Sequence, residues 1–209
     1  MKKIISLAVC LVMPFVLMGA KNAEDTPPTT SAQAFVLYCP DNNTVICSKN
    51  ADERMKPAST TKIMTSLITL EEAASCNSEV TFKQEMVVEG SSMYLKVGEK
   101  VRLSDLASGM MMASGNDAAN AAAYTISGSS EKFSQRMNEK AKQIGMTNTH
   151  FVTPSGLDDD NHYSTAKDMA LLMSYALEND DFANLTAKKS VTVEFLEPKS
   201  KKTAYANHN

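Results

Sequence analysis

The sequence lacks the patterns that bind metals or nucleic acids. It has no Cys-x-x-Cys pair, and His150, His162 and His208 are scattered, so neither a zinc site nor any other metal or cofactor is expected. No run of lysine or arginine stands out, and the formal net charge is −3, which argues against a nucleic-acid partner. No internal repeat is visible either. These absences leave metal-free enzymes and binding proteins as the classes to consider.

Long apolar runs are scarce as well, with one exception at the N-terminus. A short basic start (MKK) precedes an almost unbroken apolar run from Ile4 to Met18, and small residues follow at Gly19-Ala20 and Ala23. This layout is typical of a secretory signal peptide, whereas about 15 apolar residues are short for a membrane span. We therefore expect residues 1–20 to be a signal peptide, with cleavage after Ala23 as the alternative to Ala20, and the protein to be secreted, acting outside the cytoplasm.

The cysteine count also argues against a disulfide framework. Cys39, Cys47 and Cys76 are left once the expected signal peptide is removed, and an odd number does not form a complete set of pairs. A Cys39–Cys47 bridge across a hairpin is one alternative. Free thiols are the favoured one.

The predicted elements run from strand to helix and back to strand, which indicates an α+β fold. Residues 21–33 are polar and rich in proline and threonine, so we expect a flexible lead-in. Two β-rich runs then flank residues 40–43 (Pro-Asp-Asn-Asn), which favour the turn of a hairpin. Apolar residues spaced by three and four after Ser59 predict a helix with one buried stripe that ends near Glu71-Glu72.

Capping residues predict the elements that follow. We expect a short apolar helix capped by Ser104-Asp105 and reaching Met112, an alanine-rich helix from about Asp117 to Ile126, a helix capped by Ser129-Ser130 and closed by Gly145, a loop at 147–163, a helix from Ser164-Thr165 to about Leu177, and a strand at 191–195.

Ser59 and Lys62 are the first residues that could do chemistry. At positions i and i+3 of a helix, a hydroxyl and an amine share a face and can reach each other. A serine becomes a nucleophile when a neighbouring base takes its proton, and a lysine can be that base when burial or nearby positive charge lowers its pKa. The alternative is that Ser59 caps the helix and Lys62 points to water. The spacing alone leaves both interpretations open.

The S-x-x-K spacing occurs a second time at residues 129–132, and a small polar cluster lies at residues 114–116. Ser129 and Lys132 repeat the S-x-x-K pattern among polar residues, where a helix cap is expected. Ser114-Gly115-Asn116 lies between two apolar helices, so its hydroxyl and amide could face a cleft. Met110 to Met112, just before it, are expected in the core.

The acidic run Asp158-Asp159-Asp160 superficially resembles a calcium loop. It lacks the glycine and the terminal glutamate that an EF-hand loop needs at fixed offsets. We therefore expect a solvated turn.

Taken together, the motifs resemble the penicillin-binding D-alanyl-D-alanine carboxypeptidases, whose motif set includes S-x-x-K. The resemblance covers residues 34–205, in the family's order. Asn43 stands where a turn glycine is usual, and Thr153 where an asparagine is common. Three stretches carry the resemblance: AFVLYCPDNNTVICSKNADERMKPASTTKIMT, GSSMYLKVGEKVRLSDLASGMMMASGNDAANA and HFVTPSGLDDDNHYSTAKDMALL.

The resemblance implies a serine β-lactamase/DD-peptidase-like fold, with a helical subdomain and an antiparallel sheet, and a role for each motif residue. Ser59 would be the nucleophile that forms an acyl ester, Lys62 its general base and Ser114 a proton relay, while Asn116 would hold the substrate backbone. The substrate would be a peptidoglycan stem peptide ending in D-Ala-D-Ala, with β-lactams as inhibitors, in cell-wall biosynthesis.

The family's third motif, Lys-Thr-Gly, is not found, and Lys202-Thr203-Ala204 comes too early to be it. We therefore expect residues 34–209 to be the N-terminal part of a catalytic domain that is incomplete at its C-terminus, with peripheral membrane association confined to a longer parent protein. The alternative is a truncated, non-catalytic protein that binds peptidoglycan or β-lactams. A class A β-lactamase is disfavoured, because that class usually has Ser-Asp-Asn where Gly115 stands here.

Overall fold

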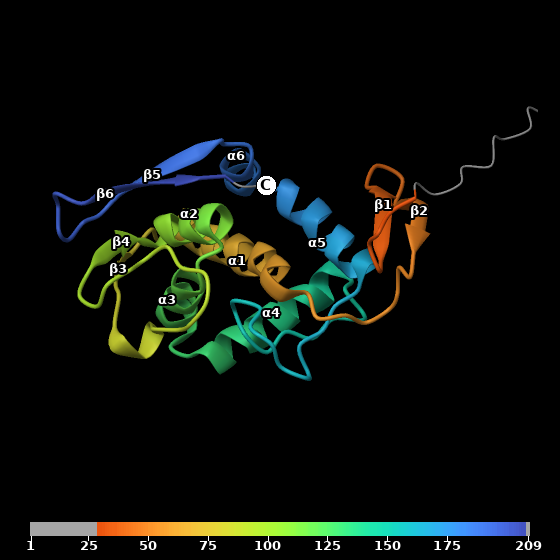
Figure 1. Ribbon diagram of the computed structural model, residues 1–209, viewed down its shortest axis with the longest axis horizontal. Coiled ribbons are helices and arrows are strands. Elements are labelled where there is room, and N and C mark those ends of the chain that lie inside the picture. The colour runs from red at the N-terminus through yellow and green to blue at the C-terminus, as the bar shows by residue number, and fades with distance from the viewer. Residues whose placement is uncertain (1–28, 208–209) are drawn as a thin grey trace, which may run out of the picture.

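The structure is a computed structural model that describes residues 29–207 (Figure 1). The expected signal peptide at 1–20 and most of the expected lead-in at 21–33 lie outside the described residues. The described helices are α1 (Lys62–Ser75), α2 (Leu103–Ala113), α3 (Asn116–Ser127), α4 (Ser130–Ile144), α5 (Ala166–Leu177) and α6 (Asp180–Thr186), with short 3₁₀ helices η1 (Ala58–Thr61) and η2 (Gln84–Met86).

The strands form three separate two-stranded antiparallel sheets. They are β1 (Phe35–Cys39) with β2 (Thr44–Lys49), β3 (Glu79–Thr81) with β4 (Lys100–Arg102), and β5 (Ser190–Glu194) with β6 (Lys202–Ala206). Figure 1 shows the β1–β2 hairpin at one end of the molecule, beyond α5, and the β5–β6 hairpin lying over α2. The α+β class is confirmed, with three small sheets in place of the one expected.

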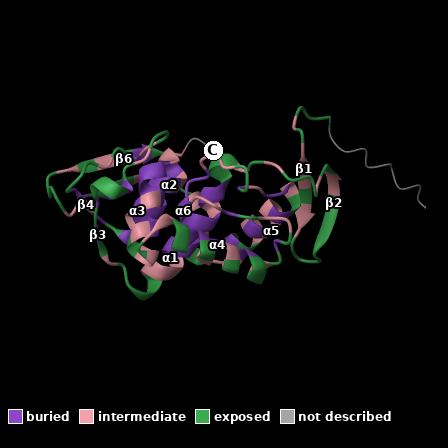
Figure 2. Cartoon of the chain, turned by 90° about the horizontal axis from the view of Figure 1, so that it is seen from below, coloured by how far each residue is buried: buried purple, intermediate pink, exposed green. Residues whose placement is uncertain are grey.

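Helix α1 is the centre of the core and contacts every other α-helix. The predicted stripe is real, since Met64, Leu67 and Ile68 are at most 1% exposed. Met110 and Met112 of α2 are buried as predicted, whereas Met111 is half-buried. The alanines of α3 allow close approach to their neighbours. Figure 2 shows the buried residues concentrated on these central helices, whereas the β1–β2 hairpin is mostly half-buried or exposed.

Most predicted boundaries are confirmed within two residues, but one predicted cap is wrong. Helix α2 begins at Leu103, and its N-cap is Arg102 rather than Ser104. The carboxylate of Asp105 accepts a hydrogen bond from the Arg102 backbone N–H (2.9 Å), which satisfies the helix start in the manner of a capping box. The elements β3, β4, α6 and β6 were not predicted from the sequence.

The predicted turn at residues 40–43 and the favoured free thiols are both found. Asn43 has a left-handed φ of +53° in the β1–β2 turn, a conformation that asparagine tolerates better than most residues. The thiols of Cys39, Cys47 and Cys76 are free.

None of the helices within residues 29–207 combines the length and the apolar composition that crossing a membrane requires.

Candidate active site

Ser59 and Lys62 meet at the start of α1. Ser59 lies in η1 and is exposed, whereas Lys62, the first residue of α1, is only 2% exposed. The Lys62 Nζ donates hydrogen bonds to Ser59 Oγ (3.1 Å) and to the Ser155 carbonyl oxygen (2.8 Å). Neither η1 nor α1 has a side-chain cap. The alternative in which Ser59 caps the helix and Lys62 points to water is therefore wrong.

Burial gives Lys62 an unusual acidity. Loss of solvation lowers the pKa of its ammonium from 10.5 to about 8, against the opposing effect of the nearby Asp117 carboxylate, whose charge raises it. A lysine with that pKa is uncharged in about one molecule in ten at pH 7. The uncharged amine can accept the Ser59 proton, which is what a general base must do.

The loop at 152–156 is tied to the start of α1 by buried polar groups. Thr65 Oγ1 donates to the Pro154 carbonyl (2.6 Å), one helical turn from the Lys62–Ser155 bond. Gly156 has φ +84°, and a Cβ there would lie 1.9 Å from the Ala58 carbonyl oxygen. Only glycine allows this close approach of the loop to the residue before Ser59.

His162 supports the same loop from behind. Its Nδ1 accepts hydrogen bonds from the Val152 (3.1 Å) and Thr153 (3.3 Å) backbone N–H groups, so the neutral ring carries its proton on Nε2, which lies 2.9 Å from Thr61 Oγ1. Burial lowers the pKa of the imidazole, in keeping with a neutral ring. The sequence shows His162 only as one of three scattered histidines, so its role here was missed.

A cleft of about 340 Å³ opens in front of Ser59. It is lined by Ala58, Ser59, Gly90, Ser91, Asn116, Ser155, Gly156, Leu157 and Asp158. Asn116, at the first position of α3, donates through Nδ2 to the Glu89 carbonyl (2.7 Å), and its backbone N–H bonds the Ser91 carbonyl (2.7 Å). Its side-chain oxygen accepts no hydrogen bond from residues 29–207, which leaves it available to a peptide N–H.

Ser114 lies close in sequence to Asn116 but is placed differently. It is half-buried at the end of α2, with a left-handed φ of +52°. Among residues 29–207, no hydrogen bond joins its hydroxyl to Ser59 or Lys62. Ser59 and Asn116 thus line one cleft, with Lys62 hydrogen-bonded to Ser59, whereas the predicted proton relay through Ser114 stays a prediction.

The second S-x-x-K copy has the structural role that was predicted for it. Ser129 is the N-cap of α4, and its Oγ accepts from the Lys132 backbone N–H (3.2 Å), while the Lys132 side chain is exposed. The acidic run at 158–160 lies in a loop, where Asp158 and Asp160 each pair with Lys56 at 3.6 Å.

We expect Ser129→Ala to lower the free energy of unfolding by about 1 kcal/mol, because the first turn of α4 loses its cap. Urea denaturation measures the change. A matched Ser130→Ala variant, one residue into the helix and without the capping bond, should stay within about 0.5 kcal/mol of the wild type. Equal losses for the two variants would contradict the capping role.

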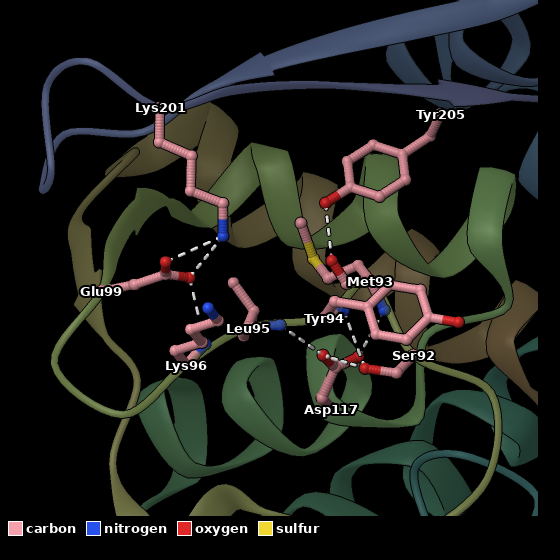
Figure 3. A network of polar contacts seen from close by, with 9 residues as sticks. All are labelled: Ser92, Met93, Tyr94, Leu95, Lys96, Glu99, Asp117, Lys201 and Tyr205. Carbon is pink, nitrogen blue, oxygen red and sulfur yellow. Dashed lines mark hydrogen bonds and ion pairs between the residues drawn. The ribbon is translucent and has the colours of Figure 1, made fainter.

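Figure 3 shows a polar network around residues 92–95, which follow the cleft-lining Gly90 and Ser91; the sequence did not reveal this network. Asp117, 4% exposed, accepts hydrogen bonds from Ser92 Oγ (2.6 Å) and from the backbone N–H groups of Met93 (2.9 Å) and Leu95 (3.0 Å). From the other side, the buried hydroxyl of Tyr205 on β6 donates to the Met93 carbonyl (2.7 Å). The 92–95 segment is therefore anchored to both α3 and the β5–β6 hairpin.

Comparison with known proteins agrees with this geometry. The sequence profile of the D-alanyl-D-alanine carboxypeptidase family matches residues 21–209. The D-alanyl-D-alanine carboxypeptidase DacF of Bacillus subtilis is 35% identical over 196 residues, which cover 89% of this chain and 50% of that protein. The chain spans about half the length of the curated relatives it matches.

Two solved structures extend the similarity to the fold. The D-alanyl-D-alanine carboxypeptidase of Mycobacterium tuberculosis superposes with a TM-score of 0.81 at 30% identity, covering 90% of this chain and 70% of that one. Penicillin binding protein 5 of Haemophilus influenzae gives 0.77 at 32% identity, covering 87% and 54%. From its sequence match, its fold and the Ser59–Lys62 pair, this chain belongs to the D-alanyl-D-alanine carboxypeptidase family.

Proposed function

We propose that this protein is a serine-type D-alanyl-D-alanine carboxypeptidase that removes the terminal D-alanine from peptidoglycan stem peptides. The observation that carries the proposal is the hydrogen bond between Ser59 Oγ and the buried Nζ of Lys62, whose pKa is lowered to about 8. A solvated lysine could not serve as a base at neutral pH, so this pair is placed for acyl transfer.

In the proposed reaction, uncharged Lys62 takes the Ser59 proton as Ser59 Oγ attacks the carbonyl carbon of the penultimate D-alanine. The peptide C–N bond then breaks, and Ser114 passes a proton from Lys62 to the departing D-alanine nitrogen. Asn116 accepts a hydrogen bond from the substrate backbone through its free side-chain oxygen. Water hydrolyses the ester on Ser59 and regenerates the enzyme.

The same proposal places the protein outside the cytoplasm, where its substrate lies. It includes β-lactams as inhibitors that acylate Ser59, secretion through the signal peptide at 1–20, and residues 34–209 as part of the catalytic domain. Family membership and the N-terminal sequence pattern support these points.

Release of D-alanine tests the proposed activity. The chain is incubated with an N-acetylated tripeptide ending in D-Ala-D-Ala and with the matched tripeptide ending in D-Ala-L-Ala, and products are followed by mass spectrometry. We expect loss of one alanine from the first peptide and a rate at least about ten-fold lower for the second, since specificity depends on transition-state fit. Equal cleavage of both peptides, or of neither, would contradict the proposal.

The rate of Ser59 acylation should rise with pH and level off above about pH 8. Because acylation needs uncharged Lys62 and the pKa of this lysine is about 8, the rate should increase about ten-fold from pH 6 to pH 7. Stopped time points of benzylpenicillin labelling, read by intact mass, give the profile. A rate that is flat between pH 6 and 8 would show that Lys62 is not the titrating base.

A further inference from the structure

A second pocket adjoins the cleft in front of Ser59. It measures about 370 Å³ and is lined by Ser91, Ser92, Tyr94, Met112, Ala113, Ala204, Tyr205 and Ala206. Ser91 lines both this pocket and the cleft. A chain that leaves the cleft past Ser91 therefore enters a space formed by the 91–94 segment on one side and β6 on the other.

The wall of this pocket is fixed before any ligand arrives. Asp117 accepts hydrogen bonds from Ser92, Met93 and Leu95. The Tyr205 hydroxyl donates to the Met93 carbonyl. Further along the segment, Glu99 accepts from the Lys96 backbone N–H (3.0 Å) and pairs with Lys201 Nζ at 2.8 Å. Figure 3 shows the segment between Asp117 and the β5–β6 hairpin, with these bonds at both ends. A wall that is already ordered can bind a ligand without the further loss of conformational entropy that ordering would require.

Tyr94 is the exception in this well-packed segment. Its neighbours Met93 and Leu95 turn inward, but Tyr94 is 77% exposed and has a left-handed φ of +63°. A bulky residue in that conformation is strained, and such strain persists only where the surroundings impose it. Here Ser92 Oγ accepts from the Tyr94 N–H (2.8 Å) and itself donates to Asp117. The fold thus keeps the Tyr94 ring exposed to solvent, although the left-handed backbone at this residue lowers the stability of the folded state.

We propose that Tyr94 and the pocket beside it bind the peptide chain on the amino side of the D-Ala-D-Ala terminus, as a specificity subsite of the acyl donor. This inference rests on the proposed function. A D-Ala-D-Ala peptide ends at its terminal carboxylate, so only its amino side continues out of the cleft. The exposed Tyr94 ring offers apolar contact area to that chain. The exposed Ser91 hydroxyl, which makes no hydrogen bond within residues 29–207, offers a polar contact.

The test compares the binding of a long peptide, which reaches the pocket beside Tyr94, with that of a short peptide, which does not. Both are N-acetylated and end in D-Ala-D-Ala, one a pentapeptide and the other the bare dipeptide. Binding is measured on the Ser59→Ala chain, which cannot form an ester, by NMR titration with ¹³C-methyl methionine. Met112 lines the pocket and reports on it, while Met137, buried in the core, is the internal reference.

We expect the pentapeptide to shift the Met112 signal and to bind about ten-fold more weakly when Tyr94→Ala is added, with dipeptide affinity changed by less than about two-fold. Tyr94→Phe should keep the affinity, and Tyr94→Gly, which relieves the left-handed strain and so folds readily, should lose it. Tyr175→Ala on α5, an exposed tyrosine that lines neither pocket, should have no effect.

Equal pentapeptide affinity with and without the Tyr94 ring would overturn the inference, as would an equal loss for both ligands. Benzylpenicillin labelling of chains that retain Ser59 reports separately on the proposed function. A penicillin adduct combined with no Tyr94 effect overturns the subsite alone, whereas a folded chain with no adduct and no D-alanine release overturns the proposed function.

Discussion

Replacing Lys62 by methionine should abolish acylation of Ser59 and at the same time stabilise the fold. Loss of a general base typically costs a factor of about 10² to 10⁴ in rate. Methionine keeps most of the side-chain length and removes a charge that the interior disfavours. Lowering the pKa from 10.5 to about 8 corresponds to a folding cost of about 3 kcal/mol at pH 7.

Part of that gain is offset because the Ser155 carbonyl loses its donor, which costs about 1 kcal/mol. We therefore expect Lys62→Met to raise the free energy of unfolding by about 2 kcal/mol at pH 7. The native pKa of Lys62 lies below its unfolded value, so the wild type is destabilised below pH 8 and recovers between pH 8 and 10.5. The advantage of the variant should shrink over the same range.

Urea denaturation at pH 7 and pH 10, together with penicillin labelling, checks both halves of this prediction. Lys132→Met is the matched control, since Lys132 has the same place in the second S-x-x-K copy but is exposed. It should change neither stability nor labelling appreciably. A Lys62→Met chain that is less stable than the wild type at pH 7, or that still labels at the wild-type rate, would contradict the role assigned to the buried amine.

Gly156→Ala should displace Ser59, suppress its labelling, and lower the free energy of unfolding by at least about 3 kcal/mol. The added methyl group would lie 1.9 Å from the carbonyl oxygen and 2.5 Å from the carbonyl carbon of Ala58. Both are backbone atoms of the residue next to Ser59, so relief of the clash requires Ser59 to move. The left-handed φ of +84° adds about 1 kcal/mol for any residue with a Cβ.

Gly145→Ala is the control for this prediction. Gly145 has φ +93°, and an added Cβ there meets nothing within 4 Å. Gly145→Ala should lower the free energy of unfolding by about 1 kcal/mol and leave labelling of Ser59 intact. Thermal melts and labelling rates compare the two variants. If Gly156→Ala behaves like Gly145→Ala in both assays, the close contact between the 152–156 loop and Ala58 does not position Ser59.

The features that could be predicted from the sequence are those set by neighbouring residues. The apolar stripe of α1, the Ser129 cap and the Gly145 end of α4 each depend on a few consecutive positions. The candidate nucleophile and base were also found, because their motifs occur in a specific order. Their burial, which decides the chemistry, was not visible from the spacing.

The missed features depend on contacts between distant residues. Tyr205 and Met93 are 112 positions apart, and Lys62 and Ser155 are 93 apart. Asp117 looks like an ordinary residue in the first turn of a helix until the 92–95 segment folds onto it. Likewise Gly156 resembles a turn glycine, and only the structure reveals that Ala58 fills the space where its side chain would be. Local patterns carry no information about such pairings.

The acylation site formed by Ser59 and Lys62 is tested by the intact mass of the chain with and without benzylpenicillin, alongside Ser59→Ala. Thermal melts of both proteins establish that each is folded. We predict one adduct per wild-type chain, located on the peptide that contains Ser59, and none on the variant. An adduct that persists in Ser59→Ala, or a folded wild type that is never labelled, would contradict the assignment of Ser59 and Lys62 as an acylation site.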